Sequence, residues 1–158
     1  MDYSFIIRKA VKEDAVAISA ILKCAFEAYK TTAGITYQLE ATTESIEEIE
    51  DDIAYKEVFI AFMDNEPVGT VRVSAIDSET AILTRLGVVP DHQNIGIGKS
   101  LMNLVDKVAK KRGFTRIQLF AASKNYDLIR FYYSRGFYVV STGEDRGYVR
   151  AMLVKEYI

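Results

Sequence analysis

Apolar side chains recur every three or four residues over positions 18–29 and again over 43–55, and this spacing predicts two amphipathic helices. The start of the second helix is open by one turn, because Ser45 and Glu48 have the spacing of a capping box. Residues 31–42, between the two helices, show no clear period and are interpreted as a loop. The first third of the chain is therefore mainly helical.

Runs of β-branched and aromatic residues predict the strands. We expect strands at residues 4–8, 57–63, 68–76, 81–89, 116–122, 138–142 and 148–157. Short turns join the second, third and fourth of them, so these three should be antiparallel. Further helices are predicted after the glycine-containing loop that ends at Gly98 and over residues 125–137. The strand at 116–122 follows a helix, so it should lie parallel to the strand before that helix.

The predicted order is β-α-α-β-β-β-α-β-α-β-β over a single domain spanning residues 1–158. No repeat, linker or low-complexity segment interrupts it. Strands that are partly antiparallel and partly parallel predict an α/β protein with a mixed sheet and helices on both sides.

Composition excludes several classes of function. The net charge is −2, from 20 basic and 22 acidic residues, which gives no electrostatic case for nucleic-acid binding. One histidine, His92, and one cysteine, Cys24, leave no basis for a histidine- or cysteine-rich metal site, so no metal is expected. No apolar run approaches the roughly 20 residues of a membrane span. We therefore expect a cytoplasmic protein that does not bind membranes.

The loop between the strand at 81–89 and the following helix has the features of an anion-binding site. Pro90 ends the strand, and glycines at positions 96 and 98 precede the helix. The first amides of a helix have no internal partner, so a diphosphate could bind the amides of residues 94–100. A Walker A loop would need glycine at Gln93, and a dinucleotide fingerprint would need glycine at Leu101. Both alternatives fail at one position.

The remaining pattern, Q-x-x-G-x-G behind an L-x-V strand, resembles the acetyl-CoA loop of the GNAT N-acetyltransferase superfamily. The stretch from Asn125 to Phe137 (NYDLIRFYYSRGF) resembles the second signature of that family, although Leu128 stands where alanine is common. The resemblance covers the whole chain and implies the GNAT fold, with acetyl-CoA as co-substrate. The residues it implies for cofactor binding are Leu86, Gly87, Val88, Gln93, Asn94, Ile95, Gly96, Ile97, Gly98, Lys99, Ser100 and Asn125.

By the same resemblance, the backbone at Leu86 and Val88 should hold the pantetheine arm and polarise the thioester carbonyl. Asn125 should bond the pantetheine through its side-chain amide. Tyr132 stands at the position of the usual proton donor for the leaving thiolate, and its alternative role is that of a packed core tyrosine.

The general base is not identified, because the strand before the loop reads Ile82-Leu83-Thr84-Arg85 and has no carboxylate. Glu27, Glu40 or Glu79 could act through water, or the acceptor amine could lose its proton to solvent. His92 is expected to be exposed rather than catalytic.

The polar face of the second predicted helix is acidic (Glu44, Glu47, Glu48, Glu50, Asp51 and Asp52). We interpret it as a solvated face, with attraction of a cationic amine as the functional alternative.

The resemblance implies an N-acetyltransferase that acts on a primary amine of a small molecule or peptide by direct attack. Cys24 is expected on a packed helix, which gives no support to an acyl-enzyme. The rival hypothesis is a non-catalytic acyl-CoA-binding or regulatory module. Tyr29, Tyr37 and Tyr148 are expected to line the acceptor entrance, and a homodimer is possible.

Overall fold

The computed structural model describes residues 5–35, 39–93 and 95–157 of the chain. Its elements are β1 (Phe5–Lys9), the 3-10 helix η1 (Lys12–Asp14), α1 (Ala15–Ala33), α2 (Glu40–Thr43), α3 (Ile46–Tyr55), β2 (Glu57–Met63), β3 (Glu66–Ala75), β4 (Thr80–Val88), the 3-10 helix η2 (Pro90–His92), α4 (Ile97–Lys111), β5 (Arg116–Ala122), α5 (Tyr126–Ser134), β6 (Tyr138–Gly143) and β7 (Arg150–Glu156).

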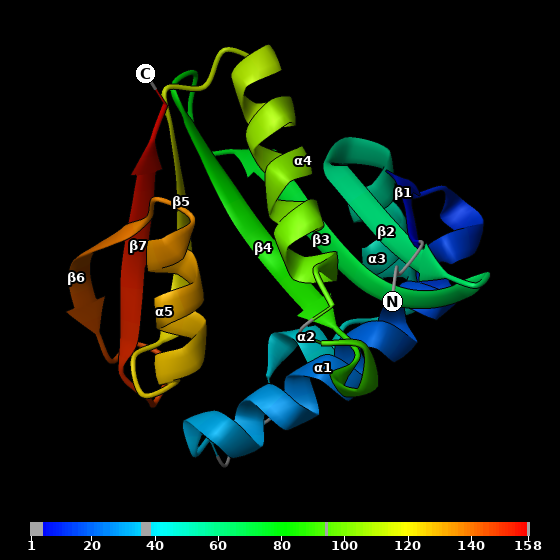
Figure 1. Ribbon diagram of the computed structural model, residues 1–158, viewed down its shortest axis with the longest axis horizontal. Helices are drawn as coiled ribbons and strands as arrows, with labels where there is room; N and C mark the ends of the chain where they lie inside the picture. The colour runs from blue at the N-terminus through cyan, green and yellow to red at the C-terminus, as the bar shows by residue number, and fades with distance from the viewer. Residues whose placement is uncertain (1–4, 36–38, 94, 158) are drawn as a thin grey trace.

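The seven strands form one mixed sheet in the order β1-β2-β3-β4-β5-β7-β6. All neighbouring pairs are antiparallel except β4 and β5, which run parallel as predicted. Figure 1 shows α4 and α5 on one face of this sheet and α1 and α3 on the other. The mixed α/β fold predicted from the sequence is therefore confirmed.

Two apolar layers hold the helices to the sheet. Between the sheet and α4 lie Val71, Leu101, Met102 and Val105, all fully buried. The layer under α1 and α3 includes Ile18 and other aliphatic side chains from both helices and from β2. Both faces of the central strands are covered, which fits their near-continuous apolar sequences.

The prediction of a loop over residues 31–42 was partly wrong. Helix α1 continues to Ala33, and in its last turn the hydroxyls of Thr31 and Thr32 donate to carbonyls one turn earlier, each at 3.1 Å. Gly34, with φ of 69°, ends the helix in the left-handed conformation that glycine adopts readily. The short helix α2 follows and was absent from the predicted order.

The later of the two predicted starts for the second helix is the observed one. Ser45 caps α3 by accepting the N–H of Glu48 at 3.1 Å, and the Glu48 carboxylate accepts the N–H of Ser45 at the same distance. This reciprocal capping satisfies two amides at the start of the helix.

None of the helices in the described ranges is both long and apolar enough to cross a bilayer.

Candidate active site

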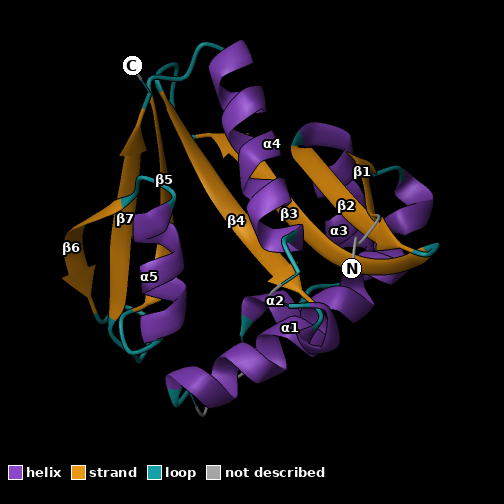
Figure 2. Cartoon of the chain, viewed as in Figure 1, coloured by secondary structure: helices purple, strands orange, loops and turns teal. Residues whose placement is uncertain are grey.

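The central feature of the molecule is a cleft where β4 and β5 separate. Their pairing is limited to Thr80–Ile82 against Arg116–Gln118, at one end of both strands. Figure 2 shows the two strands diverging from that end, with α4 on one side of the gap and α5 on the other. Side chains from both halves of the sheet line a cavity of about 900 Å³ that opens there. Separated strands leave backbone groups that a ligand can pair.

A β-bulge shapes the β4 wall of the cleft. Thr70 pairs with Gly87 and Arg72 pairs with Thr84, so β4 places two residues opposite one residue of β3. The first of the two, Arg85, has φ of +55°, which is uncommon for a residue other than glycine. Bulges occur often beside active sites, where they redirect backbone and side-chain groups. Here the bulge presents the backbone next to Leu86 to the cleft.

The start of α4 forms one end of the cleft and has the features of an anion-binding site. Gly96 has φ of +96° and ends the loop, and the first helical bond runs from the N–H of Ser100 to the carbonyl of Gly96 at 3.0 Å. The amides of Ile97, Gly98 and Lys99 precede it and have no partner within the helix. A Cβ added at Gly98 would meet Phe131 only at 3.8 Å. The backbone at Gly98 is thus approachable by a phosphate.

The predicted loop residues divide by what their side chains do. The Gln93 amide donates to the carbonyl of Val88 at 3.1 Å and so ties the loop to the end of β4. The Ile97 side chain is buried in the core, and Ile95 packs against it, so both offer only backbone to a ligand. Gln93, Gly96, Gly98 and Lys99 line the cleft, together with Leu86, Gly87 and Val88 of β4. Asn94 lies outside the described residues.

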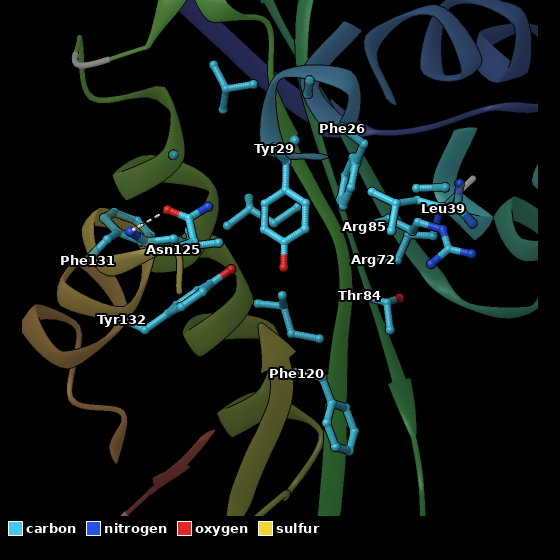
Figure 3. A pocket seen from close by; sticks show the side chains of 18 of the residues that line it. Phe26, Tyr29, Leu39, Arg72, Thr84, Arg85, Phe120, Asn125, Phe131 and Tyr132 are labelled. Atoms are coloured by element: carbon cyan, nitrogen blue, oxygen red, sulfur yellow. Dashed lines mark hydrogen bonds between the residues drawn. The ribbon is translucent and has the colours of Figure 1, made fainter. Parts of the chain in front are cut away.

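Asn125 and Tyr132 extend into the cleft from the α5 side (Figure 3). Asn125 caps α5, since its Oδ1 accepts the N–H of Leu128 at 3.4 Å, and its amide nitrogen is directed toward the cleft. Tyr132 is 4% exposed and packs edge-on against Phe131 and Phe137. The two alternatives for Tyr132 are therefore compatible, because the ring belongs to the core while the hydroxyl faces the cleft. Burial raises the pKa of this phenol, so it remains protonated.

Tyr29 faces Tyr132 across the cleft (Figure 3). Its hydroxyl oxygen accepts the N–H of Ala122 at 2.6 Å, which links α1 to the end of β5. Burial raises the pKa of Tyr29 to about 12. Tyr148 also lines the cleft and packs beside Tyr29. The predicted role of these tyrosines at an acceptor entrance stays a prediction. Tyr37 is outside the described residues.

Sequence reasoning missed the charged cluster on the side of the cleft opposite Tyr132 and Asn125. Arg72 of β3 is 1% exposed, and its guanidinium donates to both carboxylate oxygens of Glu44 at 2.8 Å and to Asp52 at 2.7 Å. The acidic face interpreted as solvated was thus only partly so: Glu47, Glu48 and Asp51 are exposed, whereas Glu44 and Asp52 turn inward. A lone arginine among buried β-branched residues was the available signal.

Of the candidate bases, Glu40 alone lines the cleft, and it pairs with Arg146 at 2.8 Å. Glu27 and Glu79 are exposed and do not line it. His92 is half-buried rather than exposed, and Cys24 is exposed on α1 as a free thiol rather than packed. Within the described residues, no group of three or more histidine, cysteine or acidic side chains is arranged to hold a metal ion.

The cleft fits coenzyme A in its chemistry: unpaired amides for phosphates at one end, open strand backbone for an amide-rich arm, and a phenol where the arm would end. Residues 17–137 match the family described as the acetyltransferase (GNAT) family. A spermidine N(1)-acetyltransferase from Thermoplasma acidophilum is 32% identical over 82 residues, which cover 52% of this chain and 50% of that enzyme. The matched stretch therefore spans about half of this relative.

Solved structures agree over the full length. The crystal structure of the PaiA N-acetyltransferase from Thermoplasma acidophilum in complex with coenzyme A is 25% identical, with a TM-score of 0.81 and coverage of 98% of this chain and 99% of that one. An acetyltransferase of the GNAT family from Streptococcus pneumoniae has the same fold, with a TM-score of 0.78 at 17% identity over 98% of this chain and 100% of that chain. The chain belongs to the acetyltransferase (GNAT) family.

Proposed function

We propose that this protein transfers the acetyl group of acetyl-CoA to a primary amine by direct attack. The observation that carries the proposal is that one cleft joins three groups: the free amides at the start of α4, the bulge at Leu86 and the hydroxyl of Tyr132. These groups suit the phosphates, the amide-rich arm and the thioester of the cofactor, respectively. Asn125 supports the same placement, since its amide can bond the arm.

The thioester supplies an activated acetyl carbon with a thiolate leaving group. In the proposed reaction the lone pair of a neutral amine forms the new C–N bond at this carbon. A backbone N–H beside Leu86 donates to the carbonyl oxygen as negative charge develops on it, which is worth roughly 2.7–4 kcal/mol in a well-studied hydrolase. The C–S bond then breaks, and the hydroxyl of Tyr132 gives its proton to the sulfur.

The amine must lose one proton in total as the amide forms. Of the three glutamates considered from the sequence, Glu40 lines the cleft and could accept it through water, and it pairs with Arg146 at 2.8 Å. The Tyr132 phenolate then regains a proton from solvent. In this scheme Tyr132 is the general acid, and solvent or Glu40 accepts the proton of the acceptor amine.

A non-catalytic acyl-CoA-binding module is the second candidate, and one observation favours it. The described part of β4 that lines the cleft carries no carboxylate, so no base stands on the strand itself. A binding module and an enzyme share the cofactor site but differ in turnover.

The test is release of free CoA thiol from acetyl-CoA with a panel of primary amines. Spermidine belongs in the panel because a relative is named for it. Thiol release that depends on an amine, with mass-spectrometric detection of the acetylated product, supports the enzyme. Tight CoA binding, with no release of CoA thiol from acetyl-CoA in the presence of any amine, supports the non-catalytic module.

We infer a cytoplasmic location as well, supported by the exposed free thiol of Cys24. A homodimer remains a prediction.

A further inference from the structure

The strongest unassigned feature of the cleft is a cation without a carboxylate of its own. Arg85 lines the acceptor side, across the cleft from Tyr132 and Asn125 (Figure 3). Its nearest carboxylate oxygens are on Glu44 at 3.8 Å and on Glu40 at 3.9 Å. Both distances exceed the roughly 3.2 Å limit of an ordinary N–H···O bond. The Nε atom of Arg85 is buried and has no hydrogen-bond partner among the described residues.

The carboxylates near Arg85 are already engaged by other cations. Glu44 accepts two bonds from Arg72 at 2.8 Å, and Glu40 pairs with Arg146 at 2.8 Å. The short bonds determine where these charges are neutralised, because Coulomb energy and hydrogen bonding both weaken at the longer distance. Arg85 therefore keeps donor capacity that the protein does not use.

The same result follows from the charges on the acceptor side as a group. The carboxylates paired there each have a cation other than Arg85 within 3.2 Å: Glu40 has Arg146, Glu44 has Arg72, Asp52 has Arg72 and Lys56, and Asp145 has Arg150. Among these five cations, Arg85 is the one whose nearest described carboxylate lies beyond 3.2 Å.

The position of Arg85 relates this charge to the chemistry. It occupies the bulge immediately before Leu86, whose backbone faces the cleft. An acceptor whose nitrogen lies at Leu86 therefore places a group a few bonds away beside the Arg85 guanidinium. A planar guanidinium matches the geometry of a carboxylate or a phosphate and can donate two parallel bonds to it.

We propose that the acceptor carries an anionic oxygen group on the same molecule as its amine, and that Arg85 binds this group. The proposal rests on the acetyl transfer proposed above and narrows its acceptor to amines of the amino acid type or their phosphate-bearing analogues. A polyamine brings several positive charges close to Arg85 and offers no anionic group to its guanidinium.

The test compares a linear amino acid, the alkylamine of the same chain length, the matching aminoalkyl phosphonate and spermidine as acceptors. The wild type is expected to show a kcat/KM about tenfold to a hundredfold higher for an anionic acceptor than for the alkylamine, as one charged hydrogen-bonded contact provides. The carboxylate and phosphonate arms identify which oxyanion the site prefers.

Variants assign the preference to Arg85. Arg85→Gln should raise KM for the anionic acceptor by about tenfold or more and leave KM for the alkylamine unchanged. Arg85→Lys keeps the charge without the planar fork, so its KM for the anionic acceptor should lie between those of the wild type and Arg85→Gln. Arg85→Asn is a second neutral variant, because asparagine tolerates positive φ and preserves the bulge. Arg130→Gln is the matched control, since it removes the same charge from an exposed position on α5 outside the cleft.

Two outcomes overturn the inference while leaving acetyl transfer intact. One is a wild type that prefers the alkylamine or spermidine, and the other is an Arg85→Gln variant that weakens all acceptors equally. Calorimetric titration of each protein with CoA distinguishes these two outcomes, in which CoA still binds, from failure of the proposed function. A wild type that binds no CoA refutes the proposed function, and the inference with it.

Discussion

At the scale of single residues, the cleft contains two phenols whose surroundings give them different roles. The hydroxyl oxygen of Tyr29 accepts a backbone N–H from Ala122, so Tyr29 acts as a structural link between α1 and β5. Tyr132 is held by aromatic neighbours and directs its hydroxyl into the cleft. Burial raises the pKa of both, which keeps them protonated and excludes either as a general base at neutral pH.

Replacing Tyr132 with phenylalanine should lower kcat by about a hundredfold to ten-thousandfold, the usual contribution of a positioned acid. The ring remains, so its packing against Phe131 and Phe137 and the affinity for CoA should not change. Steady-state kinetics and a CoA titration of the same preparation measure the two effects. Tyr126→Phe is the control, because Tyr126 is 70% exposed. An unchanged kcat in Tyr132→Phe would exclude Tyr132 as the proton donor.

The pH dependence of kcat follows from the raised pKa of Tyr132. An acid is lost only as the pH rises through its pKa, and here burial moves that pKa above its ordinary value of 10. The rate should therefore rise with pH as the acceptor amine loses its proton, and then level off without falling below about pH 10. The measurement is kcat at saturating amine between about pH 6 and pH 10. A descending limb near neutral pH that disappears in Tyr132→Phe would contradict this assignment.

At the scale of elements, the position of α4 depends on a close approach to β3. A Cβ added at Gly69 would lie 3.1 Å from Cγ2 of Ile97 and 3.3 Å from Cδ1 of Leu101. Ile97 begins α4, so the glycine of β3 sets how closely the start of the helix sits against the sheet. A tightly packed contact of this kind connects the core directly to the proposed cofactor site.

Gly69→Val should destabilise the protein by about 1–3 kcal/mol through overpacking and should also weaken CoA binding, because the start of α4 is displaced. Chemical denaturation and CoA titration measure the two effects. Gly143→Val on β6 is the matched control, since a Cβ there meets nothing within 4 Å. Equal stability of the two variants would show that α4 tolerates a larger residue at position 69.

Local patterns predicted most elements because each is consistent with its own sequence, such as the capping box at Ser45 and the β-branched run of β5. The motif register also brought Tyr132, Asn125 and the glycine loop to one cleft. Contacts between distant segments could not be predicted from local patterns or from the motifs. Arg72 and Glu44 are 28 residues apart, and nothing in either local sequence states that they meet. The Arg85 bulge likewise depends on how β4 pairs with β3.

At the scale of the whole molecule, the sheet consists of two parts joined by a short parallel contact. Strands β1 to β4 form one part, and β5, β7 and β6 form the other. Within the sheet the parts pair through three residue pairs between β4 and β5, and the bond from Ala122 to Tyr29 adds a link between β5 and α1. A ligand in the cleft contacts both parts, so its binding should stabilise the fold as a unit.

Saturating acetyl-CoA should therefore raise the melting temperature. At a ligand concentration of about 100 times Kd, the expected gain is about 2.7 kcal/mol, or roughly 5–10 °C for a domain of this size. Differential scanning calorimetry measures the shift, and a spermidine titration without cofactor serves as the comparison. A melting temperature independent of acetyl-CoA would show that the folded protein does not bind the cofactor at this concentration, which contradicts the proposed site.

Isothermal titration calorimetry of the purified chain with acetyl-CoA, free CoA, ATP and NAD tests the central claim, that the backbone amides at the start of α4 bind the diphosphate of a thiol cofactor. The account predicts one-to-one binding of acetyl-CoA and of CoA, with no comparable heat from ATP or NAD. Absence of heat with both forms of CoA, together with binding of ATP or NAD at the same loop, would contradict it.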